Sequence, residues 1–139
     1  MPSTAPWLIA ASAAILLLLG LTHLLITFSG TKLLPRDPDL RGRMQVVSPV
    51  ITRQTTMWKA WIGFNATHSV GLILFGAVYG YLALAHGAFL FASVFLLALG
   101  LLALLGYAVL ARMYFFSLPF RGVTLATALY VLGLVASRA

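Results

Sequence analysis

The chain has 139 residues, of which 62% are hydrophobic and only 8% are charged. Soluble domains carry about a quarter charged residues to keep their surfaces hydrated, so this composition excludes an ordinary water-facing fold and predicts a single membrane domain. The balance is basic, with nine Lys and Arg against two acids, but the cations lie at the ends of apolar runs. That placement indicates a bilayer with anionic headgroups as the partner, and no nucleic acid.

Apolar runs predict four transmembrane helices, at about residues 7–28, 57–84, 89–111 and 118–135. Each is close to the ~20 residues that cross the hydrocarbon layer, and only helices satisfy their own backbone polar groups there. The predicted fold class is therefore all-α, an integral membrane four-transmembrane-helix bundle. No Lys or Arg precedes the first run, so we expect a retained span rather than a cleaved signal peptide.

The connection between the first two spans, residues 30–56, is long and basic. Asp37-Pro38 carries the residue types of a helix N-cap and first helical position, and Ser48-Pro49 repeats them. From Leu40 to Ile51, apolar residues recur at helical spacing among arginines. This pattern predicts a short basic amphipathic segment on the membrane surface, although a loop packed across the helix ends fits equally well. The apolar stripe consists of Leu40, Met44, Val47 and Ile51.

Most basic residues lie in the first and third connections, which fall on the same side of a four-span protein, whereas Arg138 lies on the other side. The positive-inside rule therefore predicts cytoplasmic basic loops and an N-out/C-out topology. The second connection, residues 85–88, is expected to be a tight external turn. We expect a multi-pass protein of the bacterial inner (cytoplasmic) membrane.

Polar side chains recur on one face of the second span. Trp61, Asn65 and His68 follow each other at spacings of four and three, which places them on the same side of a helix. In the first span, Thr22 and His23 lie at a depth that matches Asn65 and His68 to within about one helical turn, ~5 Å. We therefore expect His23 to be the partner of Asn65 and His68.

Two interpretations of this polar group remain open. The first is a hydrogen-bonded cluster that fixes the register of the helices. The second is a pocket for a lipophilic ligand such as a lipid, quinone or isoprenoid, with aromatic side chains against its body and cations at the cytoplasmic rim. The predicted ligand-binding residues are Asn65, His68, His23, Trp61, Phe64, Thr22, Lys59, Arg112 and Arg121.

Hydrolytic catalysis is not expected, whereas His68 acting alone as a proton-transfer residue in an isomerase-like step stays open. The chain has no glutamate and no cysteine, and both aspartates lie in the first loop, so intramembrane carboxylate and thiol chemistry are missing. Haem or quinone is the open alternative among cofactors. His23 and His68 are the candidate axial ligands of a b-type haem, which would make the chain a component of a membrane oxidoreductase.

Glycines on the second span suggest close helix packing. Gly76 and Gly80 form a GxxxG pair that Gly71 extends, and small residues of this kind let helix backbones approach closely. Packing inside the chain is the favoured interpretation, with Ser93, Gly100 and Gly106 as the matching face. Contact with a membrane-protein partner or a second copy, which would make the chain an accessory subunit, is the alternative.

The segments GLTHLLITFSG, TTMWKAWIGFNATHSVGLILFG and LPFRG resemble a group of small four-helix bacterial membrane proteins that is broadly similar to DoxX-like proteins. The wider likeness lies in size, helix count and the region from Gly20 to His23. The resemblance implies four helices in a bacterial inner membrane. It implies no catalytic residues.

Overall fold

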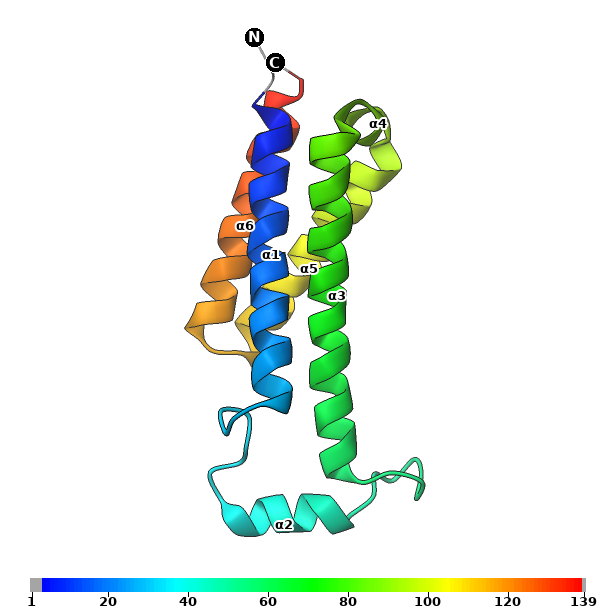
Figure 1. Cartoon of the computed structure of the whole chain (residues 1–139), viewed down its shortest axis with the longest axis vertical. Coiled ribbons are helices and arrows are strands. Elements are labelled where there is room, and N and C mark those ends of the chain that lie inside the picture. The colour runs from blue at the N-terminus through cyan, green and yellow to red at the C-terminus, as the bar shows by residue number, and fades with distance from the viewer. Residues whose placement is uncertain (1–3, 139) are drawn as a thin grey trace. The chain divides into compact units, whose positions relative to one another are not determined.

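The computed structural model describes residues 4–138, and every regular element among them is a helix (Figure 1). Four of the helices are long and apolar enough to cross a membrane. The prediction of an all-α chain with four such helices is confirmed. The helices are α1 (Ala5–Phe28), α2 (Pro38–Val46), α3 (Met57–Ala85), α4 (Gly87–Ala92), α5 (Val94–Tyr114) and α6 (Ser117–Ala136).

The third predicted span, residues 89–111, is interrupted. Ser93 has an extended backbone (φ −96°, ψ 98°), and its hydroxyl accepts a hydrogen bond from Leu96 N, as the N-cap of a helix does. The long helix α5 therefore begins at Val94 and continues to Tyr114, while α4 is a separate short helix. The external turn predicted at residues 85–88 is reduced to His86.

The first loop contains α2, which begins where the sequence predicted it. The Asp37 side chain accepts a hydrogen bond from Asp39 N at 2.9 Å, and Pro38 is the first helical residue. The second signal, Ser48-Pro49, does not start a helix. Residues 47–56 form a turn instead, so Val47 and Ile51 do not extend the apolar stripe of α2, and no residue of α2 is buried.

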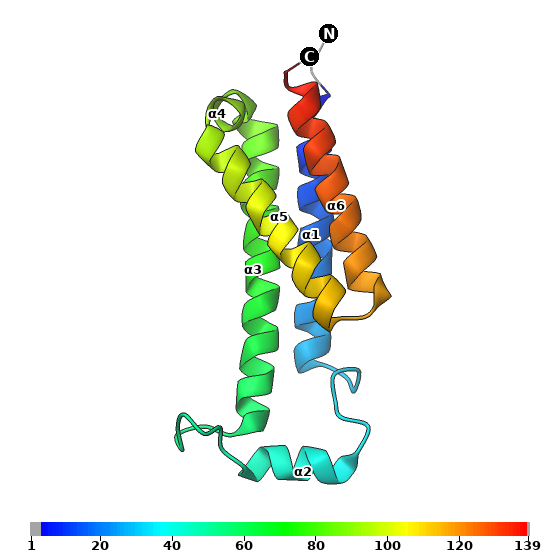
Figure 2. The same cartoon turned by 180° about the vertical axis from the view of Figure 1, so that it is seen from behind.

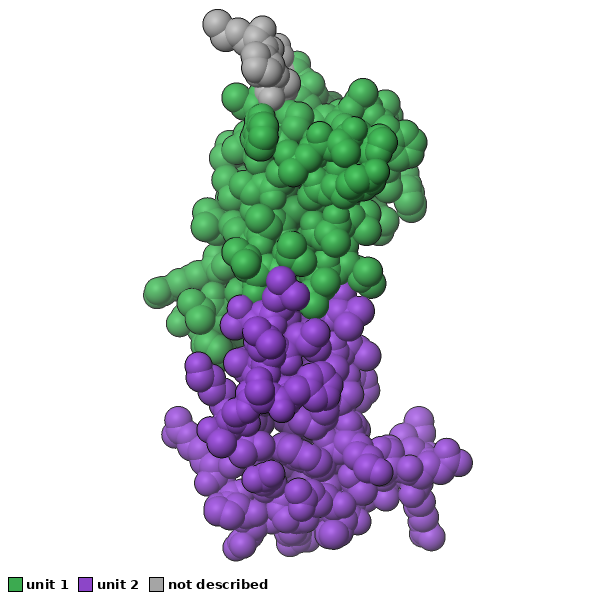
Figure 3. Space-filling model, in the orientation of Figure 1, with its two compact units in different colours: residues 1–19, 72–139 green, residues 20–71 purple. Residues whose placement is uncertain are grey.

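The chain divides into two compact units, shown in Figure 3. Unit 1 consists of residues 1–19 and 72–139, and unit 2 of residues 20–71. Both α1 and α3 contribute to each unit. Within unit 1, α5 runs obliquely from the side of α3 to the side of α6 (Figure 2). Within unit 2, α2 lies crosswise to the ends of α1 and α3.

Unit 1 has an apolar core with two tyrosines at its centre. The hydroxyl of Tyr79 donates to Leu96 O at 2.8 Å, and that of Tyr130 donates to Leu97 O at 3.1 Å. Both rings are buried, with their centroids 6.0 Å apart. The tyrosines therefore connect α3 and α6 to successive carbonyls of α5, which satisfies their hydroxyls where water is excluded.

Gly76 permits close contact between α1 and α3. A Cβ atom added there would lie 2.6 Å from Ala13 O and 2.6 Å from Leu17 Cβ. A Cβ at Gly80 would also meet Ala13, at 3.7 Å. The helix that packs against these two glycines is therefore α1. The prediction that the third span supplies the matching face is wrong. Gly100 instead faces the two tyrosines, and a Cβ at Gly106 would meet open space.

Candidate functional site

Asn65 is the centre of a hydrogen-bond network in unit 2. Its Nδ2 donates to Trp61 O at 2.8 Å, one turn earlier in α3. Because a carbonyl only accepts hydrogen bonds, this contact fixes the orientation of the amide and directs Oδ1 toward His23 Nε2, 3.0 Å away. His23 therefore carries a proton on Nε2 and donates it to Asn65.

His68 lies against His23. The centroids of their rings are 5.4 Å apart, and the ring planes are nearly perpendicular at 84°. The structure thus brings His23, Asn65 and His68 together from two helices, as their positions in the sequence predicted. All three side chains are half-buried. We call these three residues the polar cluster.

Hydroxyl groups around the polar cluster bond to the helix backbone. Thr27 donates to His23 O at 2.7 Å, and Ser69 donates to Asn65 O at 2.9 Å. Both side chains are buried. Thr22, a predicted site residue, is exposed. The side-chain contacts within the site thus come from the imidazoles and the amide, while these two hydroxyls bond their own helices.

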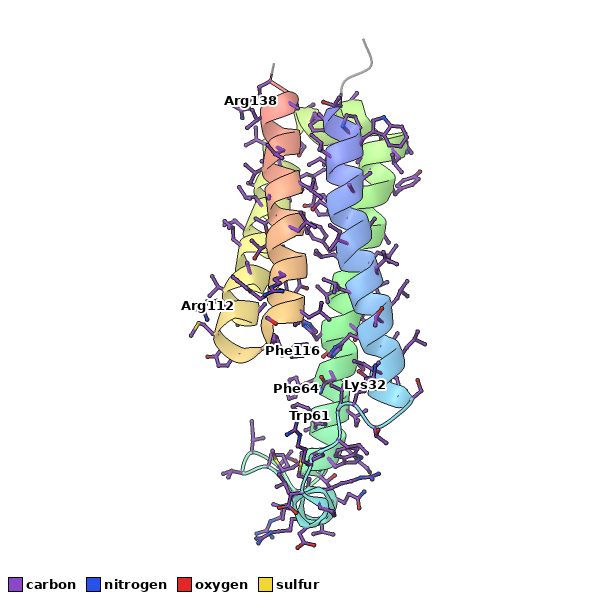
Figure 4. The ribbon with its side chains drawn as sticks, turned by 90° about the vertical axis from the view of Figure 1, so that its left-hand side faces the viewer. Lys32, Trp61, Phe64, Arg112, Phe116 and Arg138 are labelled. Atoms are coloured by element: carbon purple, nitrogen blue, oxygen red, sulfur yellow. The ribbon has the colours of Figure 1, made fainter. Side chains whose placement is uncertain are left out.

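Trp61 connects the polar cluster to the loop that follows α1. Its backbone carbonyl accepts from Asn65, and its indole Nε1 donates to Leu33 O at 3.2 Å. Phe64 is one turn away on the same side of α3 (Figure 4) and is 76% exposed. Lys59 is exposed at the start of α3. Trp61 and Phe64 therefore form an aromatic surface beside the polar cluster.

A surface cavity of about 370 Å³ lies between the loop after α1, α2 and α3. Most of its lining is apolar, and Lys32 is the charged residue in it. Sequence patterns did not indicate this cavity, because it depends on the loop folding back onto Trp61. The pair Leu33-Leu34, apolar residues within a basic loop, was the available signal. The lining residues are Lys32, Leu33, Leu34, Pro35, Met44 and Trp61.

The two arginines predicted at the rim belong to unit 1. Arg112 and Arg121 are both exposed, and the Arg112 guanidinium lies 5.8 Å from the centre of the Phe120 ring. Arg112 is at the end of α5 and Arg121 in the first turns of α6. In unit 2 the cation at the cavity is Lys32, which the sequence did not single out.

The two histidines do not fit the axial positions of a haem in this arrangement. To ligate iron through Nε2, His23 would have to release Asn65, and a porphyrin would have to enter between rings whose centroids are 5.4 Å apart. Separately from the haem question, residues 4–138 contain no group of three or more His, Cys, Asp or Glu that could hold a metal ion. The side-chain contact that joins the two helices within the polar cluster is the hydrogen bond between His23 and Asn65.

Comparison of the chain with protein-family models, with curated proteins and with solved structures gave no match. Within residues 4–138, the structure contains four helices that are long and apolar enough to span a membrane, which defines the class of the protein. The resemblance to DoxX-like proteins stays a prediction.

Proposed function

We propose that this chain is a multi-pass membrane protein that binds a lipophilic molecule in unit 2 without catalysing a reaction. The polar cluster would hold the polar head of the ligand, and Trp61 and Phe64 would pack against its body. Lys32 and Lys59 would lie at the rim, at the membrane surface. The ligand classes that this site suits are lipids, quinones and isoprenoids.

The observation that carries this proposal is that Trp61 contacts both the polar cluster and the cavity. Its carbonyl belongs to the hydrogen-bond network of Asn65, and its indole lines the cavity of about 370 Å³. Asn65 lies one turn, ~6 Å, further along the helix. Asn65, His23 and His68 do not line this cavity themselves, so Trp61 is the residue that connects the polar cluster to it. Small-molecule sites commonly combine a mainly apolar pocket with a few polar groups that orient the ligand.

The hydrogen-bonding character of the polar cluster supports the same proposal. Its imidazole and amide groups are half-buried and lie on helices long and apolar enough to span a membrane. Ionisable groups in such helices commonly face a partner or a cavity rather than lipid tails. A ligand head with hydrogen-bonding groups would match this surface, whereas an alkyl chain would not.

The distribution of basic residues supports one orientation of the chain in the membrane. The basic residues of unit 2 are Lys32, Arg36, Arg41, Arg43, Arg53 and Lys59. Arg112 and Arg121 lie on α5 and α6, on either side of the connection between these helices. We propose that both groups face the cytoplasm, with N-out/C-out topology in a bacterial inner membrane, because cytoplasmic loops carry the excess of Lys and Arg. The ligand would then enter from the inner leaflet.

An accessory-subunit role through Gly71, Gly76 and Gly80 has less support. Gly76 and Gly80 face residues of α1, so the backbone surface that these two glycines expose is used within the chain. A partner helix could not approach them without displacing α1. We therefore favour ligand binding over assembly.

The test is the ligand content of protein extracted gently with its surrounding lipid. We expect mass spectrometry to find one enriched lipophilic species, which His68→Leu and Asn65→Leu reduce. The matched control is His86→Leu, since His86 is an exposed histidine of unit 1 that contacts Tyr81, and it should leave ligand content unchanged. Unchanged ligand content in His68→Leu, with only a lower thermal stability, would assign the polar cluster a structural role and refute the proposal.

A further inference from the structure

The turn between α2 and α3 presents two fully accessible aliphatic side chains. Val50 is completely exposed and Ile51 is 91% exposed, more than the other large hydrophobic residues that the structure describes. We call these two residues the apolar tip. Single exposed apolar residues are common on proteins, but two adjacent β-branched residues at full exposure are costly in water. A binding partner would offset that cost.

The apolar tip is held by a defined turn. Met57 N donates to Val47 O at 2.8 Å and closes the base, and Thr52 N donates to Pro49 O at 3.2 Å across the turn. Gln54 N donates to Thr52 Oγ1 at 3.1 Å. The exposure of the tip is therefore imposed by backbone hydrogen bonds, and the side chains cannot simply fold back onto α2.

Cations surround the apolar tip. Arg41 and Arg43 lie on α2, and Arg53 follows the tip in the same turn, all of them exposed. The Arg41 guanidinium lies 5.5 Å from the Trp58 ring. Among the residues the structure describes, neither Asp37 nor Asp39 forms an ion pair with these arginines, and Asp37 caps α2 instead. The surface thus combines free positive charge with exposed apolar groups.

The position of the turn matches a membrane interface. It projects sideways from the start of α3 and stays near the level of the first turn of that helix (Figures 1 and 2). The first two turns of α3 carry Trp58, Lys59 and Trp61, residue types that concentrate where spanning helices leave the hydrocarbon. With α3 crossing a bilayer, a segment at this level would lie among the lipid headgroups.

We propose that the apolar tip inserts into the headgroup region of the leaflet at the unit 2 end of α1 and α3, and that Arg41, Arg43 and Arg53 bind the phosphates of anionic lipids there. Aliphatic side chains and cations together match an anionic bilayer surface, which offers apolar contact and negative charge. This surface is distinct from the polar cluster and the cavity. It rests on the assignment of α1 and α3 as spans and not on the identity of the bound ligand.

The natural absence of cysteine makes the test direct. Val50→Cys and Ile51→Cys, labelled with a nitroxide in the full chain, are reconstituted into vesicles of equal parts phosphatidylcholine and phosphatidylglycerol. We expect both labels to be shielded from a water-soluble relaxation agent and accessible to oxygen. Gln54→Cys is the matched control, because Gln54 is an exposed polar residue in the same turn and its label should remain accessible to the aqueous agent.

Charge dependence tests the second half of the proposal. Replacing Arg53 by Gln should lower insertion of the label at residue 51 about fivefold in the anionic vesicles, the fold-change equivalent to ~1 kcal/mol for one basic side chain near an anionic surface. Vesicles of phosphatidylcholine alone should abolish this difference. Circular dichroism checks that each variant retains its helices.

Three outcomes would overturn the proposal. Equal aqueous accessibility at residues 50, 51 and 54 would show that the apolar tip stays in water. Spin–spin broadening between labels at residue 51 would show that a second copy covers it. Insertion that is independent of lipid charge and of Arg53 would remove the anionic lipid from the assignment. None of these outcomes bears on the ligand content measured with His68→Leu, so the two proposals fail separately.

Discussion

Replacing Gly76 by alanine tests the contact between α1 and α3. The added methyl group would lie 2.6 Å from Ala13 O, 2.6 Å from Leu17 Cβ and 2.8 Å from Leu17 N. Two of these three atoms belong to the backbone of α1, so a rotamer change cannot relieve the contact. Since optimal separations are about 3.5 Å or more, the helices would have to move apart by roughly 1 Å.

Two opposing effects set the magnitude for Gly76→Ala. Overpacking a close contact costs about 1–3 kcal/mol. Alanine is a better helix former than glycine by up to ~1 kcal/mol, which reduces that cost. The steric effect prevails because the obstructing atoms are backbone, so we expect a net loss of stability of about 1–2 kcal/mol.

The measurement is unfolding of the detergent-solubilised protein by increasing mole fraction of dodecyl sulfate, followed by circular dichroism. Gly106→Ala and Gly63→Ala are the matched controls, because a Cβ at either position meets no atom within 4 Å. Both should be neutral or more stable by up to ~1 kcal/mol, from helix propensity alone. If the unfolding curve of Gly76→Ala coincides with theirs, α1 and α3 do not pack through Gly76 and the argument is refuted.

The same unfolding assay checks three further predictions. Tyr130→Phe removes the hydroxyl that donates to α5 and should cost about 0.5–1.5 kcal/mol. Gly100→Ala places a Cβ 2.7 Å from Tyr79 Cε1 and against the Tyr130 hydroxyl, so it should lower the stability more than Tyr130→Phe does. Adding Tyr130→Phe to Gly100→Ala should recover part of the lost stability. Strictly additive effects of the two substitutions would contradict this contact. Asn65→Leu leaves the His23 Nε2–H without its acceptor and should cost about 1–3 kcal/mol, with a changed His23 Nε2 resonance in nitrogen NMR; an unchanged resonance would argue against the hydrogen bond.

The helices could be predicted from the sequence, but the break at Ser93 could not. Residues 89–111 are apolar or glycine apart from the single Ser93, so hydropathy indicates one continuous helix there. A serine within a membrane helix usually bonds back to its own backbone and causes no break. Here its hydroxyl caps α5, and this choice depends on how α4 packs, which no local pattern contains.

Part of the candidate site could be predicted from helix geometry. Asn65 and His68 share a helical face by their spacing alone, and His23 matches them in depth, so their meeting followed from helix geometry. The cavity depends instead on the bond between Trp61 Nε1 and Leu33 O, two residues 28 positions apart in sequence. A contact between a loop and a distant helix leaves no periodic signal. Lys32 was therefore missed as the cation of the site.

The tyrosines of unit 1 and the polar cluster of unit 2 differ in burial, and this contrast supports the proposed ligand site in unit 2. In unit 1 the hydroxyls of Tyr79 and Tyr130 are buried and bonded to backbone carbonyls, which is what fixing helix positions requires. In unit 2 the polar cluster is only half-buried and shares Trp61 with a cavity. Groups that served only to hold helices together would gain most from complete burial, because water and lipid headgroups compete for exposed hydrogen-bonding atoms. The incomplete burial of the polar cluster instead agrees with the proposal that a ligand head bonds it.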